Sequence, residues 1–172
     1  AFHALEPDEF VEVKKLLDQH GLKVGCLESS LAKVHHPDKE RQKEEAEKLE
    51  LIIRAADALD CRLVRSFFFW QKRSGEGGAL ATQPDQQQIT MDMFSPLAER
   101  AKEAGLVLGF ENCGVEPDEV FTMLDFLDVP GWGIAWDPHN SWYSEECEAD
   151  EDAYIDRMLA RTNILHVKAK HA

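Results

Sequence analysis

Short apolar segments alternate along this chain with longer segments whose apolar residues recur at helical spacing. The first pattern is typical of buried strands and the second of amphipathic helices. The pattern predicts strands at residues 22–27, 62–70, 106–111, 131–137 and 164–168. It predicts helices at residues 7–19, 37–59, 89–104, 116–127 and 150–160. Because strands that alternate with helices form parallel sheets, the chain is predicted to be an α/β protein.

No linker divides the predicted elements, so we expect a single domain over residues 1–172. Strands joined by right-handed helical crossovers fit either an open doubly wound sheet or part of a (β/α)8 barrel. A long polar connection at 71–88 is predicted to cover the rim that follows the strands. The outermost strands, 22–27 and 164–168, are apolar on both faces, so we expect a homo-oligomer formed through their edges, or disordered end elements.

Three of the predicted strands end in residues that bind metals or transfer protons. Glu111, Asp137 and His166 stand at these ends, and ligands collect at the carboxyl ends of parallel strands. Burial disfavours a charged carboxylate, and a divalent cation compensates for that cost. Carboxylate oxygens with an imidazole nitrogen suit Mn, Mg, Co or Zn. The spacing therefore predicts one divalent metal held by these side chains.

Each ligand also has a simpler interpretation. Glu111 could pair with Arg65 or cap the next turn, and Asp137 before Pro138 could form a turn. His166 could be a buried histidine of the core. Lys168 shares a strand face with His166 and could bind substrate or form an ion pair at the rim. The remaining histidines considered are weaker candidate ligands: His139, His171, His35 and His36.

Composition narrows the choice of partners. Lys and Arg number 19 against 33 Asp and Glu, a net charge of −14, which argues against nucleic acid and anionic membranes. No apolar run approaches the roughly 20 residues of a membrane span, and no signal peptide is visible. The four cysteines form no CxxC pair, which favours reduced thiols. We therefore expect a cytoplasmic protein that acts on a small molecule.

Three motifs in this order resemble the sugar phosphate isomerase/epimerase superfamily, the xylose-isomerase-like TIM barrels that include apurinic endonucleases of the same fold. They are Gly-Phe-Glu-Asn at 109–112, Trp-Asp-Pro-His-Asn at 136–140 and His-Val-Lys at 166–168. The resemblance implies a partial barrel, roughly strands three to seven, because a complete one needs about 250 residues. The family's ligand on strand eight, a glutamate, has no counterpart, and Ala169 stands where the family often has Asp.

The resemblance also implies roles for individual residues. Glu111, Asp137 and His166 take the metal-ligand positions, and Glu111 also faces the substrate as a proton-transfer residue. Asn140 takes the position of a substrate-contacting residue. Apart from the resemblance, we also expect Lys168 and His139 to bind substrate. The expected function is metal-dependent isomerisation or epimerisation of a small sugar, sugar phosphate or polyol, by proton transfer next to a carbonyl. The alternatives are a phosphodiesterase of the apurinic-endonuclease type and a non-catalytic barrel fragment.

Overall fold

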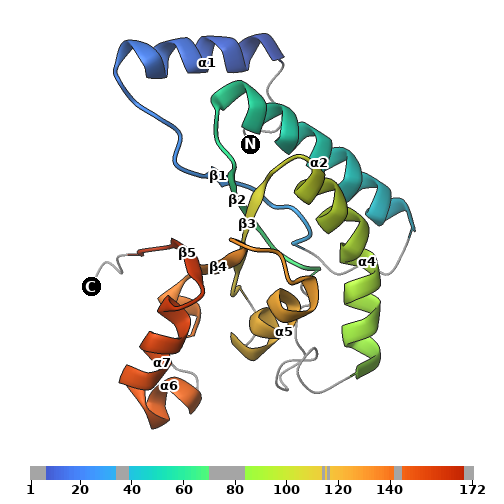
Figure 1. Ribbon diagram of the computed structural model, residues 1–172, viewed down its shortest axis with the longest axis vertical. Helices are drawn as coiled ribbons and strands as arrows, with labels where there is room; N and C mark the ends of the chain where they lie inside the picture. The colour runs from blue at the N-terminus through green and yellow to red at the C-terminus, as the bar shows by residue number, and fades with distance from the viewer. Residues whose placement is uncertain are drawn as a thin grey trace.

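A curved parallel sheet forms the centre of the computed structural model, which describes residues 7–33, 39–69, 84–113, 115, 117–141 and 145–168. The sheet has five strands in the order β1-β2-β3-β4-β5, and each neighbouring pair is parallel (Figure 1). A doubly wound sheet reverses its strand order, whereas this sheet follows the chain order as a (β/α)8 barrel does. The strands are β1 Leu27–Glu28, β2 Leu63–Ser66, β3 Val107–Glu111, β4 Gly133–Trp136 and β5 Thr162–Leu165.

Helices connect the strands and cover the outer face of the sheet. Along one side of it, α2 packs against α4 and α4 against α5, while α6 and α7 lie together near β5 (Figure 1). The helix α1 packs on α2. The helices are α1 Pro7–Gln19, α2 Lys39–Leu59, α4 Pro84–Glu103, α5 Pro117–Leu127, α6 Glu145–Ala149 and α7 Glu151–Leu159, with a short 3-10 helix, η2, at Pro138–Asn140.

The local sequence explains why α5 forms and which face it buries. Pro117 opens the helix, where its missing N–H costs nothing, and acidic residues fill the first turn next to the positive end of the helix dipole. Val120, Met123 and Leu124 are buried, at the three- and four-residue spacing that places side chains on one face of a helix. The buried stripe of α5 therefore belongs to the hydrophobic core.

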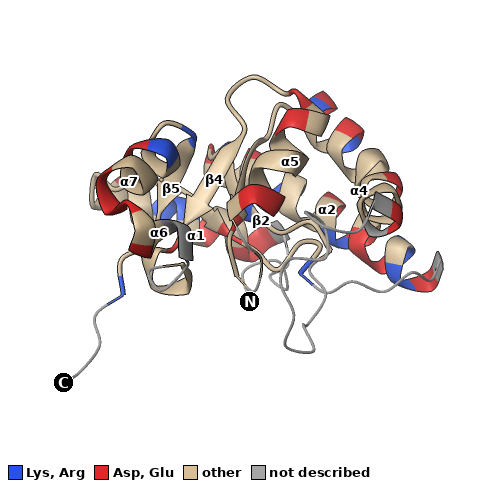
Figure 2. Ribbon diagram, turned by 90° about the horizontal axis from the view of Figure 1, so that it is seen from below, with Lys and Arg blue, Asp and Glu red and all other residues tan. Residues whose placement is uncertain are grey.

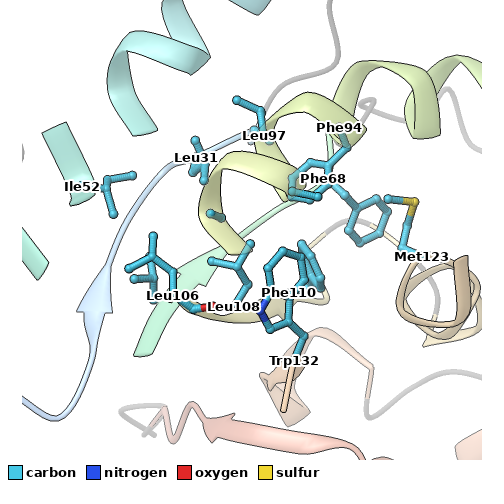
Figure 3. Packing of buried hydrophobic residues seen from close by; sticks show 14 of the residues in the cluster. Leu31, Ile52, Phe68, Phe94, Leu97, Leu106, Leu108, Phe110, Met123 and Trp132 are labelled. Carbon is cyan, nitrogen blue, oxygen red and sulfur yellow. Dashed lines mark hydrogen bonds between the residues drawn. The ribbon is translucent and has the colours of Figure 1, made fainter. Parts of the chain in front are cut away.

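An aromatic cluster fixes the outer face of β3. Phe110 is fully buried and makes edge-to-face contacts with Phe68, Phe94 and Trp132, at centroid distances of 5.9, 5.4 and 6.0 Å (Figure 3). Such contacts add to the stabilisation that burial of the rings supplies. Since successive strand residues point to opposite faces, holding Phe110 outward directs Glu111 to the inner face.

Two glycines let the inner face of the sheet curve tightly. A Cβ on Gly133 would lie 2.4 Å from the carbonyl oxygen of Arg161, and one on Gly109 would lie 2.6 Å from Asn163 Oδ1. The Asn163 amide instead crosses this space and donates to the carbonyl of Leu108, at 3.0 Å. The strand β5 thereby contacts β3 over Gly109 of β3 and Gly133 of β4, which brings the ends of nonadjacent strands together.

The expected elements are present, with shifted ends. β1 spans Leu27–Glu28, so it overlaps the predicted 22–27 at Leu27 alone and extends one residue beyond it. The two residues of β1 pair with Val64 and Arg65 of β2. β5 ends at Leu165, so His166 follows the strand. α4 begins at Pro84, inside the predicted loop 71–88, with Asp85 in its first turn. The rest of that predicted rim covering, residues 71–83, lies outside the described residues.

The structure also bears on the expectations about membrane helices and thiols, but not on those about self-association and location. Among the residues that the structure describes, no helix is both long and apolar enough to cross a bilayer. The four cysteines are reduced, as expected, and Cys61 and Cys147 are buried. Self-association through β1 and β5, and a cytoplasmic location, stay predictions.

Candidate metal centre

The predicted ligands converge at the carboxyl end of the sheet. Glu111 is the last residue of β3, and Asp137 and His166 directly follow β4 and β5. One ligand atom from each lies within 4.8 Å of the other two. The carboxylates of Glu111 and Asp137 are buried, and His166 is partly buried. The similar spacing along the chain, one strand–helix–strand unit between successive ligands, thus becomes a cluster in space because parallel strands end at one edge.

Asn112 holds the ends of β3 and β4 together. Its side chain donates to the carbonyl of Asp137 at 3.1 Å and accepts from the amide of Asp137 at 2.8 Å. Asn112 is fully buried, so water does not compete for these hydrogen bonds. This positioning role was not predicted, although Asn112 belongs to the motif at 109–112. Asn112 therefore sets the height of Asp137 relative to Glu111.

The turn expected after Asp137 is present beside the site. Asp137 Oδ1 accepts the backbone N–H of His139 at 3.1 Å, which caps η2 where it begins at Pro138. His139 and Asn140 are exposed in this short helix, next to the cluster. The turn occupies one oxygen of the Asp137 carboxylate and leaves the carboxylate within the cluster, so turn chemistry and metal binding are compatible. The candidates His35, His36 and His171 lie outside the described residues.

Two cations balance the buried carboxylates. Arg65 Nη1 donates to Glu111 Oε2, and Lys168 Nζ donates to Asp137 Oδ2. The hydrogen bond to Asp137 raises the pKa of Lys168, which keeps its ammonium charged. Both ion pairs considered from the sequence are therefore present. On the surface of α7, by contrast, acidic residues outnumber basic ones (Figure 2).

Glu28 joins the site from the opposite edge of the sheet. Its Oε1 lies 3.1 Å from His166 Nε2, so a residue of β1 meets a residue that follows β5. Its Oε2 lies 2.9 Å from Arg65 Nε, as an ion pair without hydrogen-bond geometry. The sequence carried a signal for Glu28, since it ends a strand as Glu111 does. Its partners could not be read from the sequence, because 138 positions separate it from His166.

The donor set fits a divalent cation. Bonds of about 2.0–2.2 Å to nitrogen and oxygen put two ligands of one ion at most about 4.4 Å apart, and the observed spread of 4.8 Å needs only small side-chain movements. Two carboxylates and an imidazole would leave positions open for substrate. Glu111, Asp137 and His166 would be the ligands.

Comparison with known proteins places this arrangement in a family. Residues 1–172 match the family described as xylose isomerase-like TIM barrel. The chain belongs to that family. Its sheet order, with strand-end acids and a histidine at one rim, is thus part of a barrel of the xylose isomerase-like type. A search of curated proteins found no match.

Solved structures share the fold at low sequence identity. A probable 3-DHS dehydratase from Bacillus anthracis is 15% identical with a TM-score of 0.69, and the match covers 94% of this chain and 56% of that one. A xylose isomerase-like protein from Mycobacterium smegmatis, solved in complex with magnesium, is 16% identical with a TM-score of 0.69, covering 96% and 57%. A 3-keto-D-glucoside 4-epimerase from E. coli is 14% identical with a TM-score of 0.67, covering 95% and 65%. The chain thus spans less than two thirds of the length of these structures.

Proposed function

We propose that this protein is a divalent-metal-dependent isomerase or epimerase that acts on a small sugar, sugar phosphate or polyol. The convergence of Glu111, Asp137 and His166 at the rim carries the proposal. Family membership supports it, as do structural neighbours that are named as an epimerase and as a magnesium complex. The proposal concerns the whole protein, of which this chain supplies the strands that bear these ligands.

The side chains divide the chemistry among them. Glu111 is the proposed base that removes and returns the proton next to the substrate carbonyl, and Arg65 holds its Oε2 in place. A bound divalent cation would polarise the carbonyl and stabilise the negative charge that develops beside it. Lys168, His139 and Asn140 lie around Asp137, where they would bind substrate hydroxyls or a phosphate.

The phosphodiesterase alternative has less support. A phosphodiesterase of the apurinic-endonuclease type needs several metals and a surface that attracts DNA. Within the described part of the chain, the residues grouped closely enough to share an ion are Glu111, Asp137 and His166 alone. The net charge of −14 opposes binding to a phosphate backbone. We therefore retain the isomerase or epimerase as the proposed function.

Metal titration tests the site directly. Isothermal titration with Mn²⁺ or Co²⁺ should show one site in the parent and at least about tenfold weaker binding in Glu111→Gln and His166→Ala. Glu50→Gln is the matched control, because Glu50 is exposed and pairs with Arg100 on the outer helices. Parent-like affinity in both site variants would remove the proposed metal centre.

Proton exchange tests the chemistry separately. The metal-loaded protein is incubated with ketoses and inososes in D₂O, and deuterium incorporation next to the carbonyl is followed by NMR. The parent should catalyse exchange and Glu111→Gln should not, since an amide cannot accept the proton. Metal binding without any exchange would favour the non-catalytic fragment instead.

A further inference from the structure

We infer that Glu28 is a positioning residue that sets which nitrogen of His166 faces the metal. This inference rests on the proposed metal centre and assigns a role to a residue outside the family motifs found in the sequence. Its basis is the 3.1 Å contact between Glu28 Oε1 and His166 Nε2 across the curved sheet. The side chain of His166 is only 16% exposed, so little water competes with Glu28 for that nitrogen.

Because of the chemistry of imidazole, this contact determines which ring nitrogen of His166 carries the proton. In a neutral imidazole one nitrogen carries the proton and the other carries the lone pair that can bind a metal. The hydrogen bond made by one nitrogen determines this assignment. With Glu28 accepting the proton of Nε2, the lone pair is on Nδ1. A carboxylate behind a metal-bound histidine also makes the histidine a stronger ligand. Glu28 therefore leaves Nδ1 as the nitrogen for the cation.

Arg65 explains why Glu28 stays in place although half of its side chain is exposed. The guanidinium pairs with Glu28 through Nε, at 2.9 Å, and donates to Glu111 through Nη1. One arginine thus holds both the carboxylate behind His166 and a carboxylate ligand. The two oxygens of Glu28 face different partners, which fixes the plane of its carboxylate.

Glu28 acts behind the histidine and is not a further ligand. Among the described residues, the converging donor atoms come from Glu111, Asp137 and His166, and Glu28 is outside that group. One oxygen of Glu28 contacts Nε2 of His166, and the other faces Arg65. A direct bond to the ion would require at least one oxygen of Glu28 to leave its partner.

The tautomer of His166 is measured first, in the metal-free parent. A two-bond ¹H–¹⁵N correlation spectrum at about pH 8 identifies the protonated ring nitrogen, and His166→Ala assigns the signal. The inference expects the proton on Nε2. A proton on Nδ1 in the parent would overturn the inference without any Glu28 variant being needed.

Metal affinity is measured next, in Glu28→Ala and Glu28→Gln. Glu28→Ala should bind Mn²⁺ about 10- to 100-fold more weakly and shift His166 toward the other tautomer. Glu28→Gln should recover part of both effects, since its amide oxygen can accept the Nε2 proton, whereas Glu50→Ala should match the parent. Parent-like affinity and tautomer in Glu28→Ala would refute the role of Glu28. Failure of the parent itself to bind Mn²⁺ would instead refute the proposed metal centre.

Discussion

Replacing Lys168 with Met tests whether an ion pair stabilises the site before any metal binds. Asp137 is 0% exposed at its side chain and Lys168 is 54% exposed, so the change removes the cation and leaves the carboxylate buried. A hydrogen bond between charged groups contributes about 1.5–3 kcal/mol. Because solvent screens the exposed ammonium, we expect a loss of about 1–2 kcal/mol. For a domain of this size that lowers the unfolding temperature by roughly 2–8 °C.

The pH dependence of this difference follows from the raised pKa of Lys168, which the hydrogen bond to Asp137 causes. A raised lysine pKa stabilises the folded state fully below the ordinary value of about 10.4, and the effect is lost as pH rises through the folded value. The difference between parent and Lys168→Met should therefore stay constant from about pH 7 to 10 and shrink above that range.

Thermal unfolding followed by circular dichroism measures the effect. Lys102→Met, an exposed lysine in the last turn of α4, is the control and should unfold with the parent. Added Mn²⁺ should stabilise Lys168→Met at least as much as the parent, because the ion takes the place of the ammonium beside Asp137. If Lys168→Met and the parent unfold at the same temperature in the absence of metal, the stabilising role of Lys168 is refuted.

Three further predictions concern the packing and the thiols. Phe110→Ala should cost about 3–5 kcal/mol in urea denaturation, since the ring is fully buried among aromatic partners; a loss below about 1 kcal/mol would contradict that packing. Gly133→Ala should destabilise the fold, because its Cβ would meet the Arg161 carbonyl, whereas Gly25→Ala, with open space around it, should not. Equal urea midpoints for Gly133→Ala and Gly25→Ala would contradict the close approach of the Arg161 carbonyl to Gly133. Burial raises the pKa of Cys26 to about 11, so iodoacetamide at about pH 9 should modify it far more slowly in the folded protein than in urea, by peptide mass spectrometry. Equal rates would show a thiol with an ordinary pKa.

The alternation of apolar and polar positions determined much of the architecture. Local patterns are enough to distinguish strands from helices, so α1, α5 and α7 lie where they were predicted, within one or two residues. The strand-end positions of Glu111 and Asp137 could also be predicted, because parallel strands end at one edge whatever their exact pairing. The motifs gave the family, and the family explains the barrel order of the strands.

Only the tertiary structure decided the contacts that complete the site. Whether Arg65 pairs with Glu111, and whether Lys168 reaches Asp137, depends on side-chain reach over a curved sheet. Asn163 fills the space above two glycines and donates to Leu108, a contact between β5 and β3 that no local periodicity encodes. Glu28 meets His166 for the same reason: residues distant in the chain become neighbours only when the whole sheet curls and brings its first and last strands together.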